Sequence, residues 1–224
     1  MGAESIKRAE DRLRCEQAVR GLDALDELGI QSLLVEGFGE AGWGVLREVV
    51  YPTPPSRRAR RAERDRCDIV LTEAPGVTLV DAVEVARAQD EREATLFAGV
   101  MAPGVPTGAD PREAVWIEVK TLGQFACVDG VPRPNRSYAT ELVRGAAIDA
   151  RKLASDPLIE RGFAVVVLFA ASVSVAYHDL GVAAHRLLDL GAPITAPAWE
   201  IAPIADRIGN CVCAVWATGV RSER

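Results

Sequence analysis

The sequence predicts an α/β protein in which a central mixed β-sheet is flanked by helices. Short segments rich in Val, Ile and Leu alternate along the chain with segments whose apolar residues recur at helical spacing. One segment, FAVVVLFA at 163–170, is continuously apolar, which is typical of a strand buried on both faces. Hydrophobic residues make up 49% of the 224 residues and aromatic residues only 5%, so aliphatic side chains must fill a sizeable core.

The first expected elements are two helices and a strand. Apolar residues recur near the 3.6-residue period through residues 4–28, and Gly29 supplies a stop signal. A second, shorter helix is expected from Ile30 to about Ala41. The Val-rich segment WGVLREVVYP then predicts a strand that Pro52 ends.

Two further strands are expected in the middle of the chain. A Pro- and Arg-rich loop at 53–66 leads to CDIVLT at 67–72, and AVWIEVKT at 114–121 follows. Between them, residues 73–113 show no clear periodicity and contain loop-like Gly and Pro, so we expect an insertion there.

The remaining elements complete the order α-α-β-β-β-α-β-α-β. A helix is expected from Ser137, as N-cap, to about Ala154. It is followed by the apolar strand at 163–170, a helix over GVAAHRLLDL and a last strand over NCVCAVWATG. This alternation predicts helices on both sides of one sheet, with residues 171–224 either completing that sheet or forming an accessory lobe.

Charge and composition exclude several classes of protein. The net charge of −6 and pI of about 5.1 argue against a general polyanion binder, so any contact with nucleic acid must be local. The N-terminal segment is charged from its fourth residue on and has no apolar leader, and no run approaches the ~20 apolar residues of a membrane span. We therefore expect a cytoplasmic protein with no membrane partner, whose five scattered cysteines are reduced.

Charged residues occur inside two of the expected strands. Because side chains alternate along a strand, Trp116, Glu118 and Lys120 share one face, and Ile117 and Val119 share the other. The same rule places Cys67, Ile69 and Leu71 on one face of the upstream strand, and Asp68 with Val70 on the other. If the strands pair, two carboxylates and an ammonium come together. The alternative is a solvated face with a cross-strand ion pair.

This grouping has a chemical logic. Two carboxylates suit Mg²⁺ or Mn²⁺, which prefer oxygen ligands. Such a cation activates water and neutralises charge on a phosphate, and a neighbouring lysine stabilises developing negative charge. The residues are those needed to hydrolyse a phosphodiester.

The pattern RCDIVLT … WIEVKT resembles the PD-(D/E)xK nuclease superfamily, which includes restriction endonucleases and repair nucleases. Cys67 stands where the signature usually has proline. The resemblance implies a single domain over 1–224 with a restriction-endonuclease-like core at 30–170. Because Asp68 and Glu118 are 50 positions apart, farther than in the family's typical hairpin, it also implies that residues 73–113 are an insertion.

Carried over position by position, the resemblance implies that Asp68, Glu118 and the carbonyl of Val119 bind the metal, and that Lys120 is the catalytic lysine. Family members often add an acid from the helix before the first strand. Glu36 and Glu40 are the candidates, and Glu36 is preferred because it lies in the middle of the expected helix, whereas Glu40 lies in the glycine-rich turn.

The resemblance also implies polar residues near the scissile phosphate on the helix at 137–154. The candidates for nucleic-acid contact are Tyr138, Arg144, Arg151 and Lys152. The arginine-rich run from Arg57 to Arg66 is either a further phosphate contact or a solvated loop.

The expected function is that of a Mg²⁺-dependent nuclease, an enzyme acting on DNA, and many proteins of this fold form homodimers to cut both strands. Two alternatives stay open: a catalytically silent binding or structural module of the same fold, and a metal-dependent hydrolase of a small phosphorylated molecule. The acidic charge suits both alternatives.

Overall fold

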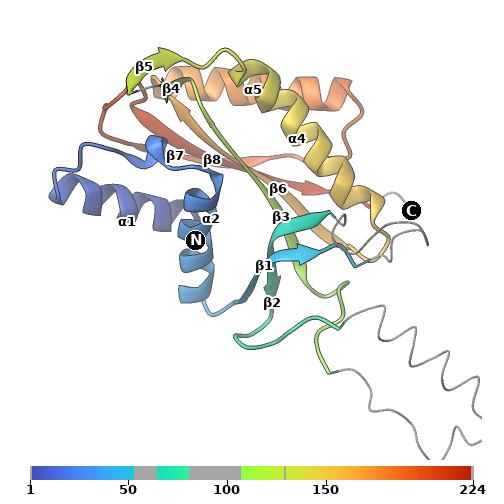
Figure 1. Cartoon of the computed structure of the whole chain (residues 1–224). Helices are drawn as coiled ribbons and strands as arrows, with labels where there is room; N and C mark the ends of the chain where they lie inside the picture. Colours follow the sequence, from blue (N-terminus) through green and yellow to red (C-terminus); the bar gives the residue numbers. More distant parts are fainter. Residues whose placement is uncertain (1, 53–64, 81–106, 129, 223–224) are drawn as a thin grey trace, which may run out of the picture.

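A six-stranded mixed sheet forms the centre of the molecule (Figure 1). The computed structural model describes residues 2–52, 65–80, 107–128 and 130–222. The strands lie in the order β1-β2-β3-β6-β8-β7, and only β3 and β6 run parallel. Their bounds are β1 Gly44–Val50, β2 Arg66–Thr72, β3 Val115–Gly123, β6 Arg161–Ala170, β7 Ala198–Pro203 and β8 Val212–Val220. The predicted α/β class with a central mixed sheet is confirmed.

Helices cover both faces of this sheet. On one face, α4 (Tyr138–Ser155) and α5 (Val173–Asp189) pack in one apolar cluster with the buried Trp116 and Trp216. On the other, α1 (Gly2–Cys15) and α2 (Glu27–Glu40) pack against Ile117 of β3. None of the described helices combines the length and apolar composition that crossing a bilayer requires.

The first helix is shorter than predicted. The chain leaves α1 at Cys15, and a short 3₁₀ turn at Leu22–Ala24 precedes α2. The carboxylate of Asp26 accepts a hydrogen bond from the Gly29 N–H, which caps α2 and places Gly29 in its first turn. The stop expected at Gly29 is therefore wrong, because a capping carboxylate three residues earlier starts a new helix there.

The face predicted for one residue of β2 is also wrong. Ile69 and Leu71 pack on the α2 side as expected, but Cys67 joins the cluster on the α4 side. Opposite this part of β2, the backbone of Glu48 has a φ of 51°, a left-handed conformation that is uncommon for residues other than glycine. The distorted ladder here breaks the regular alternation that the prediction assumed.

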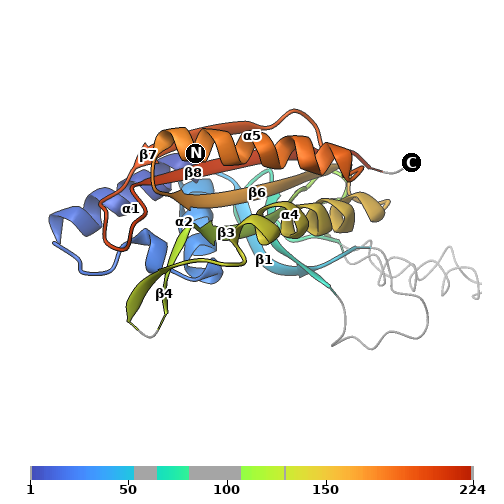
Figure 2. The same ribbon diagram turned by 90° about the horizontal axis from the view of Figure 1, so that it is seen from above.

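Three strands were not predicted. Strands β4 (Phe125–Val128) and β5 (Val131–Pro134) form a separate hairpin that projects from the end of β3 (Figure 2). The third is β7, a short, largely exposed edge strand that ends in proline. Together β7 and β8 place the C-terminal part of the chain in the main sheet. The insertion expected at 73–113 lies largely outside the described residues.

Candidate active site

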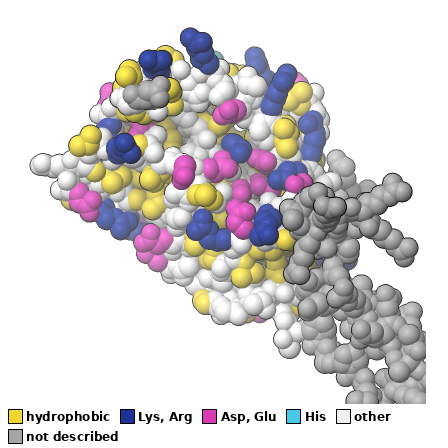
Figure 3. Space-filling model, viewed as in Figure 1, with side chains coloured by type: hydrophobic (Ala, Val, Ile, Leu, Met, Phe, Trp, Pro, Cys, Tyr) yellow, Lys and Arg dark blue, Asp and Glu magenta, His cyan; other side chains and the backbone are white. Residues whose placement is uncertain are grey.

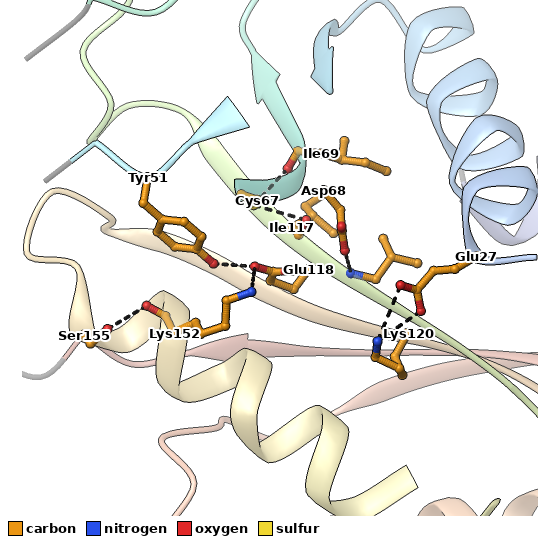
Figure 4. A network of polar contacts seen from close by, with 11 residues as sticks. Glu27, Tyr51, Cys67, Asp68, Ile69, Ile117, Glu118, Lys120, Lys152 and Ser155 are labelled. Carbon is orange, nitrogen blue, oxygen red and sulfur yellow. Dashed lines mark hydrogen bonds and ion pairs between the residues drawn. The ribbon is translucent and has the colours of Figure 1, made fainter. Parts of the chain in front are cut away.

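One edge of β3 is open beside the centre of the sheet. Strand β2 pairs with β3 only as far as Ile117, whereas β6 pairs with β3 along its whole length. Beyond Ile117, carboxylates take the place of a neighbouring strand among the described residues. The Val119 N–H donates to Asp68 at 2.7 Å, and the Thr121 N–H donates to Glu27 at 3.2 Å. Within the predicted strand WIEVKT, Trp116 and Ile117 therefore have a neighbouring strand on both sides. The residues from Glu118 on pair with β6 alone and form an open edge of the sheet (Figure 4).

Glu118 projects from β3 into a buried, polar position. Only 4% of the residue is exposed. Its Oε1 accepts hydrogen bonds from the Tyr51 hydroxyl at 2.5 Å and from the Lys152 ammonium at 3.0 Å. Burial raises the pKa of Glu118 to about 7. The Tyr51 hydrogen bond opposes this rise, and the negative charge of Asp68 adds to it. Glu118 therefore needs a compensating positive charge to stay ionised near neutrality.

Lys120 meets a carboxylate from the opposite face of the sheet. Its Nζ lies 3.1 Å from Oε2 of Glu27, in the first turn of α2. Burial lowers the pKa of Lys120, but the charge and hydrogen bond of Glu27 outweigh that effect, so the pKa is raised overall. The two side chains meet because β2 does not cover this edge of β3. Lys120 is consequently held as a cation beside Glu118 and Asp68.

Six ionisable side chains form one electrostatic cluster at this edge. Besides the residues above, Asp149 of α4 interacts with both lysines and with the carboxylates of Asp68 and Glu27, and burial raises its pKa. The members are Glu27, Asp68, Glu118, Asp149, Lys120 and Lys152. With every member ionised, four carboxylates face two ammonium groups, which leaves a formal charge of −2. A divalent cation would balance that charge. Figure 3 shows acidic and basic side chains interspersed over the middle of this face.

The available donor atoms fit a cation that prefers oxygen. Neither Oδ1 of Asp68 nor Oε2 of Glu118 accepts a hydrogen bond from a described residue. The N–H and C=O of a strand residue point to the same edge, so the Val119 carbonyl also lies on the open edge. Two carboxylate oxygens and a carbonyl leave room for the waters that Mg²⁺ retains. Within the described ranges, no three Asp, Glu, His or Cys side chains are grouped to hold a metal by themselves.

The predicted core of the site is brought together in space. Asp68, Glu118, Val119 and Lys120 lie side by side although 50 residues separate the two acids, and Lys152 joins them from α4. Metal binding and catalysis by these residues stay predictions.

The helix acid expected at this site lies elsewhere. Glu36 lines a hollow between α1, the 3₁₀ turn and α2, and Glu40 pairs with Arg8 of α1. The acid of α2 that reaches β3 is Glu27, at the other end of the helix. Sequence reasoning missed Glu27 because it continued the first helix through residue 28 and so placed Glu27 outside the second.

Most of the residues expected to touch nucleic acid face α5 instead. The Tyr138 hydroxyl donates to Asp179 at 2.8 Å, and Arg151 donates to the Leu190 carbonyl at 2.7 Å. Arg144 lines a hollow between α4 and α5. Their contact with nucleic acid stays a prediction. The run from Arg57 to Arg66 lies outside the described residues except for its last two, of which Arg66 donates to the Glu48 carbonyl.

Lysine usage offers a signal that could have linked Lys152 to the motif. The chain has 26 basic residues, of which only three, Lys7, Lys120 and Lys152, are lysines. Two of these three lie in the cluster around Glu118. Where this chain needs a positive charge it almost always has arginine, so two lysines here point to a requirement for the compact ammonium group.

The chain was also compared with known proteins. No protein-family model, curated protein or solved structure matches it. The function is therefore inferred from the geometry of the site.

Replacing Glu118 by Gln is expected to flatten the pH dependence of stability. The folded state holds the Glu118 proton up to about pH 7, whereas the unfolded state releases it near 4.5. The free energy of unfolding therefore falls as the pH rises through this window, by roughly 3 kcal/mol for a shift of this size. Gln does not titrate, so the variant lacks this fall. Urea unfolding at several pH values measures it, with the exposed Glu200→Gln as control. If the free energy of unfolding fell equally with pH in wild type and Glu118→Gln, the raised pKa could not belong to Glu118.

Proposed function

We propose that the chain is a Mg²⁺- or Mn²⁺-dependent nuclease that hydrolyses phosphodiester bonds, with DNA as its substrate. The observation that carries this proposal is the convergence of Asp68, Glu118 and Lys120 on the open edge of β3. The order of elements from α2 to β6 supports a core of the PD-(D/E)xK type, with the β4–β5 hairpin inserted before α4. In such a core, the three residues have the roles of metal ligands and catalytic lysine.

Each residue of the site has a distinct task in this proposal. Asp68 and Glu118 would hold the cation, with the Val119 carbonyl as a third oxygen ligand. A bound Mg²⁺ would supply Lewis-acid charge neutralisation at the phosphate and would activate water. Lys120 donates hydrogen bonds to the negative charge that develops as the P–O bond breaks. Glu27 keeps the ammonium protonated and aimed at the open edge.

A second candidate is a binding module of the same fold that does not cleave. Both lysines of the site are already paired, Lys120 with Glu27 and Lys152 with Glu118. If those pairs served only to balance buried charge, the cluster would be structural. The two candidates differ in whether a divalent cation enters the site.

A cleavage assay tests the proposal. Circular plasmid, linear duplex and single-stranded DNA are incubated with the protein and Mg²⁺ or Mn²⁺, and parallel reactions contain EDTA. The proposal predicts cutting of at least one substrate that EDTA stops. No cutting of any substrate, together with no measurable binding of either metal, would favour the binding module.

A further inference from the structure

Two side chains from outside the motif strands hold one oxygen of Glu118. Tyr51 follows β1 and Lys152 lies in the last turn of α4, yet both donate to the same atom, Oε1, at 2.5 and 3.0 Å (Figure 4). No described residue donates to the other oxygen, Oε2. The two donors therefore engage Oε1 of the carboxylate and leave Oε2 available to bind a ligand.

Aromatic packing positions Tyr51, and the Tyr51 ring in turn contacts Lys152. The Tyr51 ring stacks on the fully buried Trp116, with 6.1 Å between ring centroids and 28° between ring planes. The Trp116 indole N–H in turn donates to the Pro111 carbonyl at 2.9 Å. The Lys152 ammonium lies 5.7 Å from the centroid of the Tyr51 ring, so it contacts both the tyrosine and the carboxylate. Such support restricts how far Glu118 can rotate.

A carboxylate held in this way discriminates between divalent cations. Ca²⁺ takes six to eight oxygens at about 2.3–2.6 Å and readily accepts both oxygens of one carboxylate. Mg²⁺ requires a near-octahedral shell at about 2.0–2.1 Å and takes single oxygens together with waters. Because Oε1 of Glu118 already accepts two hydrogen bonds, bidentate coordination would require breaking at least one of them.

We propose that Tyr51 and Lys152 are positioning residues that make Glu118 a one-oxygen ligand and so select Mg²⁺ and Mn²⁺ over Ca²⁺. This inference rests on the proposed function and specifies the metal selectivity of that site. Neither residue needs to touch the substrate. The scarcity of lysine in the chain fits this role, because a compact ammonium shares Oε1 with a tyrosine hydroxyl more easily than a broad guanidinium does.

Calorimetric titration with Mg²⁺ and with Ca²⁺ tests the inference on the full chain. The variants are Tyr51→Phe, which retains the ring stacked on Trp116, Lys152→Gln, and the two combined. Loss of supporting residues typically lowers metal affinity about 10- to 100-fold. We expect such a loss for Mg²⁺ and a much smaller one for Ca²⁺, so the preference for Mg²⁺ falls about tenfold or more. Lys152→Arg retains a donor but places a broader guanidinium beside the tyrosine hydroxyl, so it is expected to keep only part of the preference.

Matched controls and the unfolding temperature separate this effect from damage to the fold. Tyr177→Phe and Lys7→Gln alter an exposed tyrosine of α5 and an exposed lysine of α1, and both should leave the preference unchanged. A folded double variant with the wild-type Mg²⁺/Ca²⁺ preference would overturn the inference alone. A wild-type chain that binds no divalent cation would overturn the inference and the proposed function together.

Discussion

Asp68→Asn is expected to lose Mg²⁺ binding while the protein stays folded. The amide has the shape of the carboxylate, and its oxygen can still accept the Val119 N–H that Asp68 now accepts at 2.7 Å. It lacks the negative charge that a metal ligand of this type supplies. Because loss of supporting residues alone costs about 10- to 100-fold in affinity, loss of a ligand should cost more than about 100-fold. Calorimetric titration with Mg²⁺ measures the change.

The control for Asp68→Asn is Asp110→Asn. Asp110 is an exposed loop residue that pairs with Arg112, also at the surface. This variant should bind Mg²⁺ as wild type does. A folded Asp68→Asn protein with wild-type affinity would show that the cation, if one binds, sits elsewhere.

Lys120→Ala is expected to lower the rate of DNA cleavage about 10²- to 10³-fold, the usual cost of removing one group that stabilises transition-state charge. Metal binding should persist, because Lys120 contacts Glu27 and not the proposed ligands. Cleavage under single-turnover conditions gives the rate, and calorimetry gives the affinity for Mg²⁺. Lys7→Ala removes an exposed lysine of α1 and serves as the matched control. Equal cutting by Lys120→Ala and wild type would point to a contaminant or to another site.

The acidic charge of the chain is compatible with a nucleic-acid substrate on one condition. A protein of net charge −6 has little general attraction for a phosphate backbone. The cluster at the open edge of β3 is itself formally negative, since four carboxylates there outnumber two ammonium groups. A divalent cation would neutralise it and would give the substrate phosphate a positive partner. We therefore expect DNA binding at this site to depend on the metal.

The alternation of side chains along the expected strands predicted much of the fold and part of the site. The alternation in WIEVKT correctly separated Trp116 from Ile117 and Val119, because β3 is regular and is paired with β6 throughout. It also brought Asp68 to Glu118, since two apolar strands that carry charge have few ways to pair and bury their apolar faces. These inferences depend on local periodicity, which a single sequence displays directly.

The rest of the site depends on features that periodicity does not encode. Because Asp26 caps α2, the helix begins at Glu27, and Glu27 rather than Glu36 contacts Lys120. Cys67 lies on an unexpected face, next to the point where the neighbouring strand has a left-handed backbone at Glu48, a non-glycine residue. Tyr51 and Lys152 reach Glu118 only because separate elements pack around β3. Such contacts are set by tertiary packing.

Mg²⁺-dependent cleavage of circular DNA by the full chain, with Lys120→Ala assayed in parallel, tests the central claim most directly. The rate for wild type is predicted to rise with Mg²⁺ and to saturate over the same range in which calorimetry detects binding. Lys120→Ala should bind Mg²⁺ equally but cut about 10²- to 10³-fold more slowly. Cleavage that is absent at every Mg²⁺ concentration, or that is the same in both proteins, would contradict the assignment of Asp68, Glu118 and Lys120 as a nuclease site.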